Sequence, residues 1–301
     1  MKPEVSPAAQ VESSRSPRAS RDLTRWWTLT PVTLWMCVLF VLPLILVLAV
    51  SFMSRTSFGG IEYSFSLDNY SRFFDSLYIK ILWVSCQLAF LTTVLCLFIG
   101  YPFAYIIARS PAKYRNLLLL LVIVPFWTNS LIRTYAWIVL LRTEGVINAI
   151  LLQLGLIGSP LTLLYNDMAV LIGLVYTMLP FMILPLYASI EKLDRSLLEA
   201  ASDLGARPLQ TFWKVTLPLT APGIMAGTLL VFIPSLGLFF IPDLMGGSKS
   251  ILIGNLIKNQ FLSARDWPFG SAISIILMAL TLLFIAAYVR ISKDKAGKGL
   301  M

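Results

Sequence analysis

The chain lacks the residue patterns of the common catalytic, metal-binding and phosphate-binding sites. It contains no His, so a Ser/His/Asp triad cannot form. No group of possible metal ligands has the spacing of a zinc site, and no G-x-x-x-x-G-K-[ST] phosphate loop occurs. The three cysteines, Cys37, Cys86 and Cys96, lie in apolar segments and are expected to be buried thiols. We therefore expect no catalytic residue, no metal and no cofactor in this chain.

One segment, residues 199–218, combines acidic, small and turn-forming residues at a regular spacing. Ser196 and Glu199 have the spacing of a capping box, which predicts that a helix begins there. Gly205 would permit a sharp turn after it, and Pro208 suits the first turn of a second helix. Taken alone, the pattern is also typical of an amphipathic helix on a membrane surface. The residues that make it distinctive are Glu199, Ala200, Ala201, Gly205, Leu217 and Pro218.

The spacing of these residues resembles the EAA loop of ABC importer permeases. That loop reads Glu-Ala-Ala, three residues, Gly, nine residues, and then an aliphatic residue followed by x-Leu-Pro, as residues 199–218 do here. The resemblance implies a type I ABC importer permease, in which this loop contains the coupling helix that docks an ATPase. The chain would then be the membrane half of an ATP-driven importer, and a separate subunit would use the ATP.

Composition independently predicts an all-α polytopic membrane protein. Apolar residues make up 57% of the chain and charged residues 13%, against about 25% charged in soluble domains, and the mean hydropathy is +0.80. A membrane-spanning helix needs about 20 apolar residues. The runs that meet this requirement predict six spans, at about 31–53, 82–108, 117–141, 168–190, 219–241 and 268–289.

A seventh apolar run, residues 145–166, is divided by a Gly-Ser-Pro turn signal. With six spans and a cytoplasmic N-terminus, 16 Lys and Arg residues lie inside and 8 outside, whereas a seventh span would give 11 inside and 13 outside. The positive-inside rule therefore favours six spans, with 145–166 as an external helix and turn. This topology leaves both termini and the loop 191–217 in the cytoplasm.

The domain organisation follows from this topology. Residues 1–25 are polar and rich in Ser and Pro, which predicts a disordered cytoplasmic tail. Residues 26–290 form the permease domain, and 291–301 form a short cytoplasmic tail. The net charge of +9 is attributed to basic cytoplasmic loops facing the anionic lipid bilayer, because no basic–aromatic module for nucleic acid is present.

Further segments resemble the spermidine/putrescine group of these permeases, and the resemblance runs from about residue 32 to 290. It implies polyamine import across a bacterial inner membrane. It also implies three partners: a second permease subunit, a dimer of ATPase subunits and an extracytoplasmic substrate-binding protein. The segments that carry it are Val124–Tyr135, Leu179–Met182, Leu184–Tyr187, Ile233–Gly247 and Arg265–Pro268.

A polyamine path needs carboxylates or aromatic faces to meet the ammonium groups. The outer end of the fifth span offers Phe239, Phe240 and Asp243. The outer part of the third span offers Trp127, Asn129 and Tyr135. Two simpler interpretations compete with this one. Aromatic residues also form belts at membrane interfaces, and Asp243 could be a solvated loop residue.

Other functions remain open at this point. The same type of permease could carry another organic cation, an opine or an iron complex. A self-sufficient secondary transporter would instead show paired repeats and ionisable residues for ion coupling within its spans. The predicted spans contain almost no charge; Arg133 is the exception, and we expect it to reach outward or to pair with a carboxylate. A structural membrane scaffold would leave the 199–218 spacing unexplained.

Overall fold

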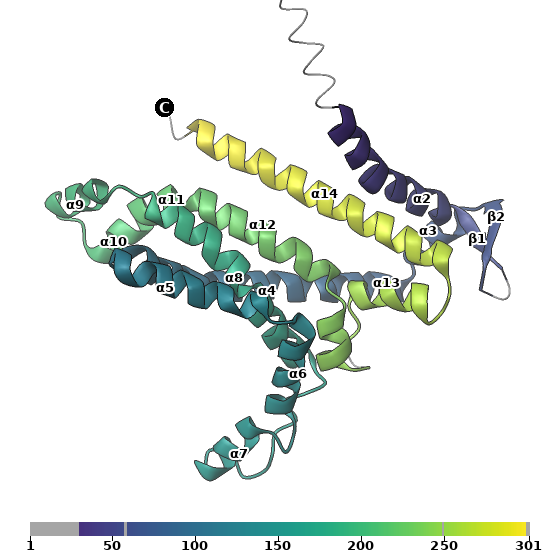
Figure 1. Ribbon diagram of the computed structural model, residues 1–301, viewed down its shortest axis with the longest axis horizontal. Helices are drawn as coiled ribbons and strands as arrows, with labels where there is room; N and C mark the ends of the chain where they lie inside the picture. Colours follow the sequence, from purple (N-terminus) through teal and green to yellow (C-terminus); the bar gives the residue numbers. More distant parts are fainter. Residues whose placement is uncertain (1–29, 57–58, 249, 299–301) are drawn as a thin grey trace, which may run out of the picture.

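In a computed structural model, residues 30–56, 59–248 and 250–298 form a long helical bundle with one small β-hairpin (Figure 1). The predicted N-terminal tail, residues 1–25, lies outside the described residues. The predicted C-terminal tail is helical as far as Lys298, because the last helix runs on beyond its apolar part.

Three helices form the centre of the bundle: α4 (Ser76–Arg109), α8 (Asp167–Glu191) and α12 (Ala221–Gly237). They can approach closely because α12 presents glycines to α8. A Cβ atom on Gly227 would lie 2.6 Å from the sulfur of Met182, and one on Gly223 would lie 2.7 Å from the carbonyl oxygen of Pro185. Small residues at helix contacts are the usual means of close packing in membranes.

Several elements lie at one end of the bundle, where the side chain of Asp266 is only 1% exposed. They are α2 (Leu42–Ser51), β1 (Met53–Arg55), β2 (Ile61–Phe65), α3 (Asp68–Phe73), α13 (Ile253–Leu262) and α14 (Trp267–Lys298). Asp266 Oδ2 accepts a hydrogen bond from Arg72 at 2.8 Å, and Oδ1 accepts one from the backbone N–H of Phe269. The carboxylate thus joins α3 to the start of α14.

Five helices in the described part of the chain are long and apolar enough to cross a membrane. A sixth results if the pair Pro208–Leu219 and Ala221–Gly237, bent by 66°, is one span. The five helices are Thr30–Ser51, Ser76–Arg109, Ser130–Gln153, Asp167–Glu191 and Trp267–Arg290. Their positions agree closely with four of the predicted spans, and the bent pair covers most of a fifth.

The region of the third predicted span, 117–141, differs from the expectation of one helix. It is divided into α5 (Ala112–Ile123), the 3₁₀ turn η2 (Val124–Trp127) and α6 (Ser130–Leu141). Pro125 opens the turn, and the side chain of Asn129 accepts a hydrogen bond from the N–H of Leu131 and so starts a new helix. The break was not predicted, because the segment is mostly apolar and the prediction used the length of apolar runs.

A short helix, α7 (Val146–Gln153), follows α6, and the two project from the side of the bundle (Figure 1). Gly155, with φ +68°, turns the chain directly after α7, three residues before the Gly158-Ser159-Pro160 signal on which the predicted turn was based. Because Ser130–Gln153 taken together could cross a membrane, the external position of 145–166 stays a prediction.

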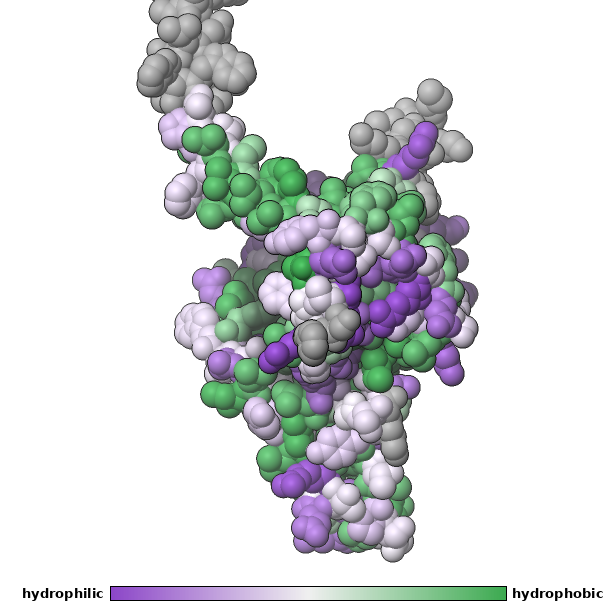
Figure 2. Space-filling model, turned by 90° about the vertical axis from the view of Figure 1, so that its right-hand side faces the viewer, coloured by the Kyte–Doolittle hydropathy of each residue, from purple (hydrophilic) through white to green (hydrophobic). Residues whose placement is uncertain are grey.

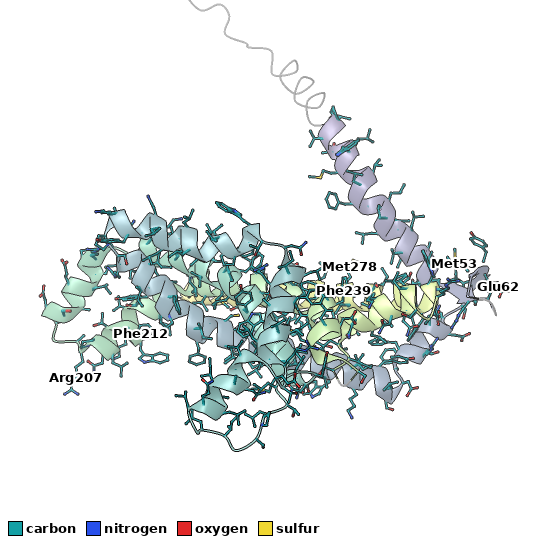
Figure 3. All side chains as sticks on the ribbon, turned by 60° about the horizontal axis from the view of Figure 1, so that its bottom comes forward. Met53, Glu62, Arg207, Phe212, Phe239 and Met278 are labelled. Carbon is teal, nitrogen blue, oxygen red and sulfur yellow. The ribbon has the colours of Figure 1, made fainter. Side chains whose placement is uncertain are left out.

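The bundle has two distinct ends. Helices α9 (Arg195–Asp203) and α10 (Pro208–Thr211) lie at one end, near the C-terminal end of α14, and the hairpin β1–β2 lies at the other (Figure 1). Figure 3 shows Arg207 and Phe212 at the first end and Met53 and Glu62 at the second. Viewed from the hairpin end, hydrophilic residues gather over the end of the bundle, while apolar residues cover α2 and much of the projecting part (Figure 2).

Candidate functional site

The first candidate site is the loop 191–217 at the end of the bundle opposite the hairpin. Its first helix, α9, begins at Arg195, and Asp194 is the residue that caps it. Asp194 Oδ1 accepts a hydrogen bond from the backbone N–H of Ser196 at 3.0 Å. The predicted capping box from Ser196 to Glu199 was therefore wrong. The helix is instead capped by Asp194, an equally favourable cap residue with an extended backbone, two residues earlier.

The turn predicted at Gly205 is confirmed, and its geometry explains the spacing of the motif. Gly205 has φ +79°, and its N–H donates to the carbonyl of Ser202 at 2.9 Å. The next N–H, of Ala206, donates to the carbonyl of Ala201 at 3.0 Å. These two bonds define a Schellman motif, which ends α9 and uses the left-handed backbone that glycine adopts most easily.

Beyond the turn, Pro208 opens α10, as the sequence predicted. The chain continues through η3 (Phe212–Thr216) and α11 (Leu217–Leu219) into α12. Of the motif residues, Glu199, Ala200, Gly205 and Pro218 are exposed, while Ala201 and Leu217 are half-buried. The loop also exposes four large apolar side chains, with Leu204 as much as 88% exposed; the others are Leu197, Leu209 and Trp213. An exposed apolar surface of this kind is typical of a site that binds another protein or a membrane.

The loop is joined to the bundle through Phe212 and Tyr101. The two rings meet edge to face at 5.5 Å between centroids. The hydroxyl of buried Tyr101, on α4, shares a hydrogen bond of 3.0 Å with the hydroxyl of Thr220, at the start of α12. These contacts connect the loop 191–217 to two of the three central helices. Sequence analysis missed them, because the residues are far apart in the chain and follow no short pattern.

The second candidate site is at the opposite end of α12, where Asp243 lies on the π-helical turn η4 (Pro242–Gly246). Its carboxylate Oδ2 forms an ion pair with the ammonium Nζ of Lys258, on α13. Phe239 lies one helical turn before Asp243, with its carbonyl accepting from the Asp243 N–H at 3.1 Å, and is 46% exposed. Asp243 is therefore neither deeply buried nor simply solvated. Sequence analysis missed Lys258, since no short spacing relates it to Asp243.

The turn η4 is held in place independently of this ion pair. The backbone N–H of Tyr165 donates to the carbonyl of Met245 at 2.9 Å. Beyond the turn, the hydroxyl of Ser250 donates to Asp167 Oδ1 at 2.5 Å, at the start of α8. Ile241 and Met245 are fully buried against α8. The π-helical form of such a turn is frequent at functional sites.

The other predicted path residues are on η2 and α6. Asn129 caps α6, which gives it a structural role in this chain. Trp127 and Tyr135 are 75% and 54% exposed, which suits either a pore lining, a subunit contact or an interfacial belt. Phe240 packs with Phe239 at 6.3 Å and borders the core around Ile241.

Arg133 lies between two aromatic rings. Its guanidinium carbon is 6.0 Å from the ring centre of Phe126 and 5.8 Å from that of Tyr176. In the described part of the chain no carboxylate lies within ion-pair distance of it, and its Nε and Nη1 atoms have no hydrogen-bond partner. The rings offset part of the cost of this partly buried charge.

Comparisons with known proteins assign a family. A family model described as "Binding-protein-dependent transport system inner membrane component" matches residues 100–296. The chain is 51% identical over 259 residues to the spermidine/putrescine transport system permease protein PotB of Escherichia coli (strain K12), covering 86% of this chain and 94% of the relative. The PotB protein of Haemophilus influenzae is 49% identical, with 86% and 91% covered.

Solved structures agree in fold. A bacterial ABC transporter that imports the acidic polysaccharide alginate contains a chain with a TM-score of 0.76 and 19% identity, covering 92% of this chain and 99% of that one. A second structure of such a transporter, in complex with an alginate pentasaccharide-bound periplasmic protein, gives a TM-score of 0.73. At this identity the likeness shows the fold alone.

Proposed function

The chain belongs to the family of binding-protein-dependent transport system inner membrane components, and on that premise we propose that it is the permease subunit of an ATP-driven polyamine importer. Spermidine and putrescine are the proposed substrates. The high identity to permeases named for these substrates supports this choice over an opine or an iron complex.

The geometry of the loop 191–217 carries the proposal. Two short helices joined at Gly205 present exposed apolar side chains at one end of the bundle, and Phe212 connects them to α4 through Tyr101. Such a surface can receive a motion from a partner and pass it to the central helices. We assign the docking of the ATPase to Glu199, Ala200, Ala201, Gly205, Leu217 and Pro218.

The remaining partners are proposed in the same way. A second permease subunit would complete the pore, two ATPase subunits would bind below it, and an extracytoplasmic binding protein would deliver the polyamine. Both termini and the loop 191–217 would then face the cytoplasm. The shared location of that loop and the C-terminal end of α14 at one end of the bundle supports this arrangement (Figure 1).

The proposed path for the cation starts at the other end of the bundle, at Asp243, Phe239 and Phe240, with Trp127, Asn129 and Tyr135 as further candidates. The carboxylate of Asp243 already contacts one ammonium group, that of Lys258, which supports its ability to accept another.

Uptake in cells tests the proposed substrate. A bacterial strain without polyamine uptake should accumulate labelled spermidine or putrescine when it expresses this chain with its second permease, ATPase and binding protein. Omission of this chain alone should abolish that uptake. If the full set shows no polyamine uptake but accumulates another solute, the substrate assignment is wrong and the family assignment stands.

A further inference from the structure

We propose that Lys258 is a tethered competitor of the substrate: its ammonium group occupies the Asp243 carboxylate when no polyamine is present, and a polyamine ammonium group displaces it. This inference rests on the proposed function and assigns a specific binding site within it. The observation behind it is the ion pair between Asp243 on η4 and Lys258 on α13.

The chemistry of the two ligands is closely matched. The lysine side chain is a four-carbon chain that ends in a primary ammonium group, and the aminobutyl end of putrescine or spermidine is the same unit. An ammonium group acts as a compact point charge with freely rotating donors. A carboxylate therefore distinguishes only weakly between the ammonium group of Lys258 and that of a polyamine. The site that holds Lys258 is therefore chemically suited to the end of a polyamine.

The backbone that carries Asp243 is held by contacts that do not involve Lys258. Met245 on η4 accepts a hydrogen bond from the backbone N–H of Tyr165, just before α8, and its side chain is fully buried against α8. The backbone of α13 is anchored separately, since the N–H of Ile253 donates to the hydroxyl of Ser85 at 2.8 Å. Opening the ion pair thus requires only rotations within the Lys258 side chain.

The pair is also reachable, which separates it from the other acidic contact at this end. The side chains of Lys258 and Asp243 are 28% and 26% exposed, and Phe239 beside them offers an aromatic face. Asp266, by contrast, is almost fully buried, pairs with Arg72 and caps α14. Asp266 is therefore placed to stabilise the fold, whereas Asp243 is placed where a ligand can replace its present partner.

Competition of this kind has a measurable consequence. A ligand that binds only the open form has an apparent affinity reduced by the fraction of time for which the site is open. If Lys258 occupies Asp243 for about nine-tenths of the time, its removal should tighten polyamine binding about tenfold. Lys258→Met removes the charge and keeps much of the side-chain volume.

The test is equilibrium binding of labelled spermidine to the purified membrane complex, without the binding protein, in lipid nanodiscs. Lys258→Met should lower the dissociation constant by about three- to tenfold, and Asp243→Asn should raise it by about tenfold or more. The double variant should match Asp243→Asn, because Lys258 acts only through that carboxylate. Lys80→Met, which removes an exposed charge near the start of α4, is the matched control and should change nothing.

Three results would overturn the inference. The first is unchanged or weaker binding in Lys258→Met. The second is an equal loss of complex yield and thermal stability in Lys258→Met and Asp243→Asn, which would make the pair a structural tie. The third is the absence of saturable binding in both wild type and Lys258→Met. Failure of the wild-type importer to take up polyamine would overturn the proposed function as well, whereas normal uptake with any of these three results would overturn only the role of Lys258.

Discussion

At the scale of single residues, position 205 has the clearest requirement for one residue type, glycine. Its left-handed backbone ends α9, and apart from its chain neighbours no described residue lies within 4 Å of where its Cβ atom would be. The requirement is therefore conformational within the chain, and any steric requirement belongs to the docked partner.

Gly205→Ala should strain the loop by about 1 kcal/mol and weaken the association of the ATPase, with membrane insertion unchanged. Co-purification of the ATPase with the permease measures this effect. Gly155→Ala is a matched control, because Gly155 also has a positive φ and open space around it but lies after α7. Equal ATPase association in both variants would contradict the docking assignment.

The ion pair of buried Asp266 with Arg72 predicts a loss of stability when its charge is removed. Asp266→Asn keeps the cap on α14 and loses the charge that faces Arg72, so it should lower the stability of the complex by about 1–3 kcal/mol. Although burial by itself lowers the pKa of the Arg72 guanidinium, hydrogen bonds to Asp266 and Tyr78 outweigh it and raise that pKa. The loss should thus be the same across neutral pH. Thermal unfolding measures it, with exposed Asp75→Asn as the control; equal melting temperatures would remove Asp266 from this role.

At the scale of elements, apolar run length predicted most of the helices, because a spanning helix must exceed a minimum length of apolar residues. It did not predict the break between α5 and α6, since Val124, Pro125 and Phe126 are apolar whether the chain turns or not. The helix–turn–helix form of the loop was predictable because Gly205 and Pro208 act locally. Its cap at Asp194 and the pairing of Asp243 with Lys258 were not, because competing caps and distant partners are decided by tertiary structure.

The contact between the loop and α4 gives the prediction at this scale. Tyr101→Phe removes the hydroxyl that bonds Thr220 and should destabilise the junction by about 1 kcal/mol. We expect transport per ATP hydrolysed to fall, while the ATPase remains bound. Parallel assays of uptake and ATP hydrolysis give this ratio. Tyr105→Phe, one turn further along α4, is the control, and an identical ratio in the two variants would argue against coupling through Tyr101.

At the scale of the whole molecule, the orientation in the membrane is the main expectation that the fold leaves open. Ser159→Cys places a thiol in the turn after α7, and a membrane-impermeant thiol reagent added to intact cells should label it from outside. The native cysteines, Cys37, Cys86 and Cys96, provide the background in the unsubstituted chain. Labelling only after the inner face is exposed would place the turn after α7 in the cytoplasm, which requires one more crossing before it, and would reverse the sidedness of the loop 191–217.

The measurement that tests the central claim most directly is spermidine accumulation in proteoliposomes that contain the complete importer. The account predicts uptake against a concentration gradient only when hydrolysable ATP is on the side of the loop 191–217 and the loaded binding protein is on the other. Glu199→Lys, which reverses a charge on the docking surface, should abolish this uptake and leave the permease inserted. Accumulation driven by an ion gradient without ATP, or uptake unaffected by Glu199→Lys, would contradict the account of this chain as an ATPase-coupled permease.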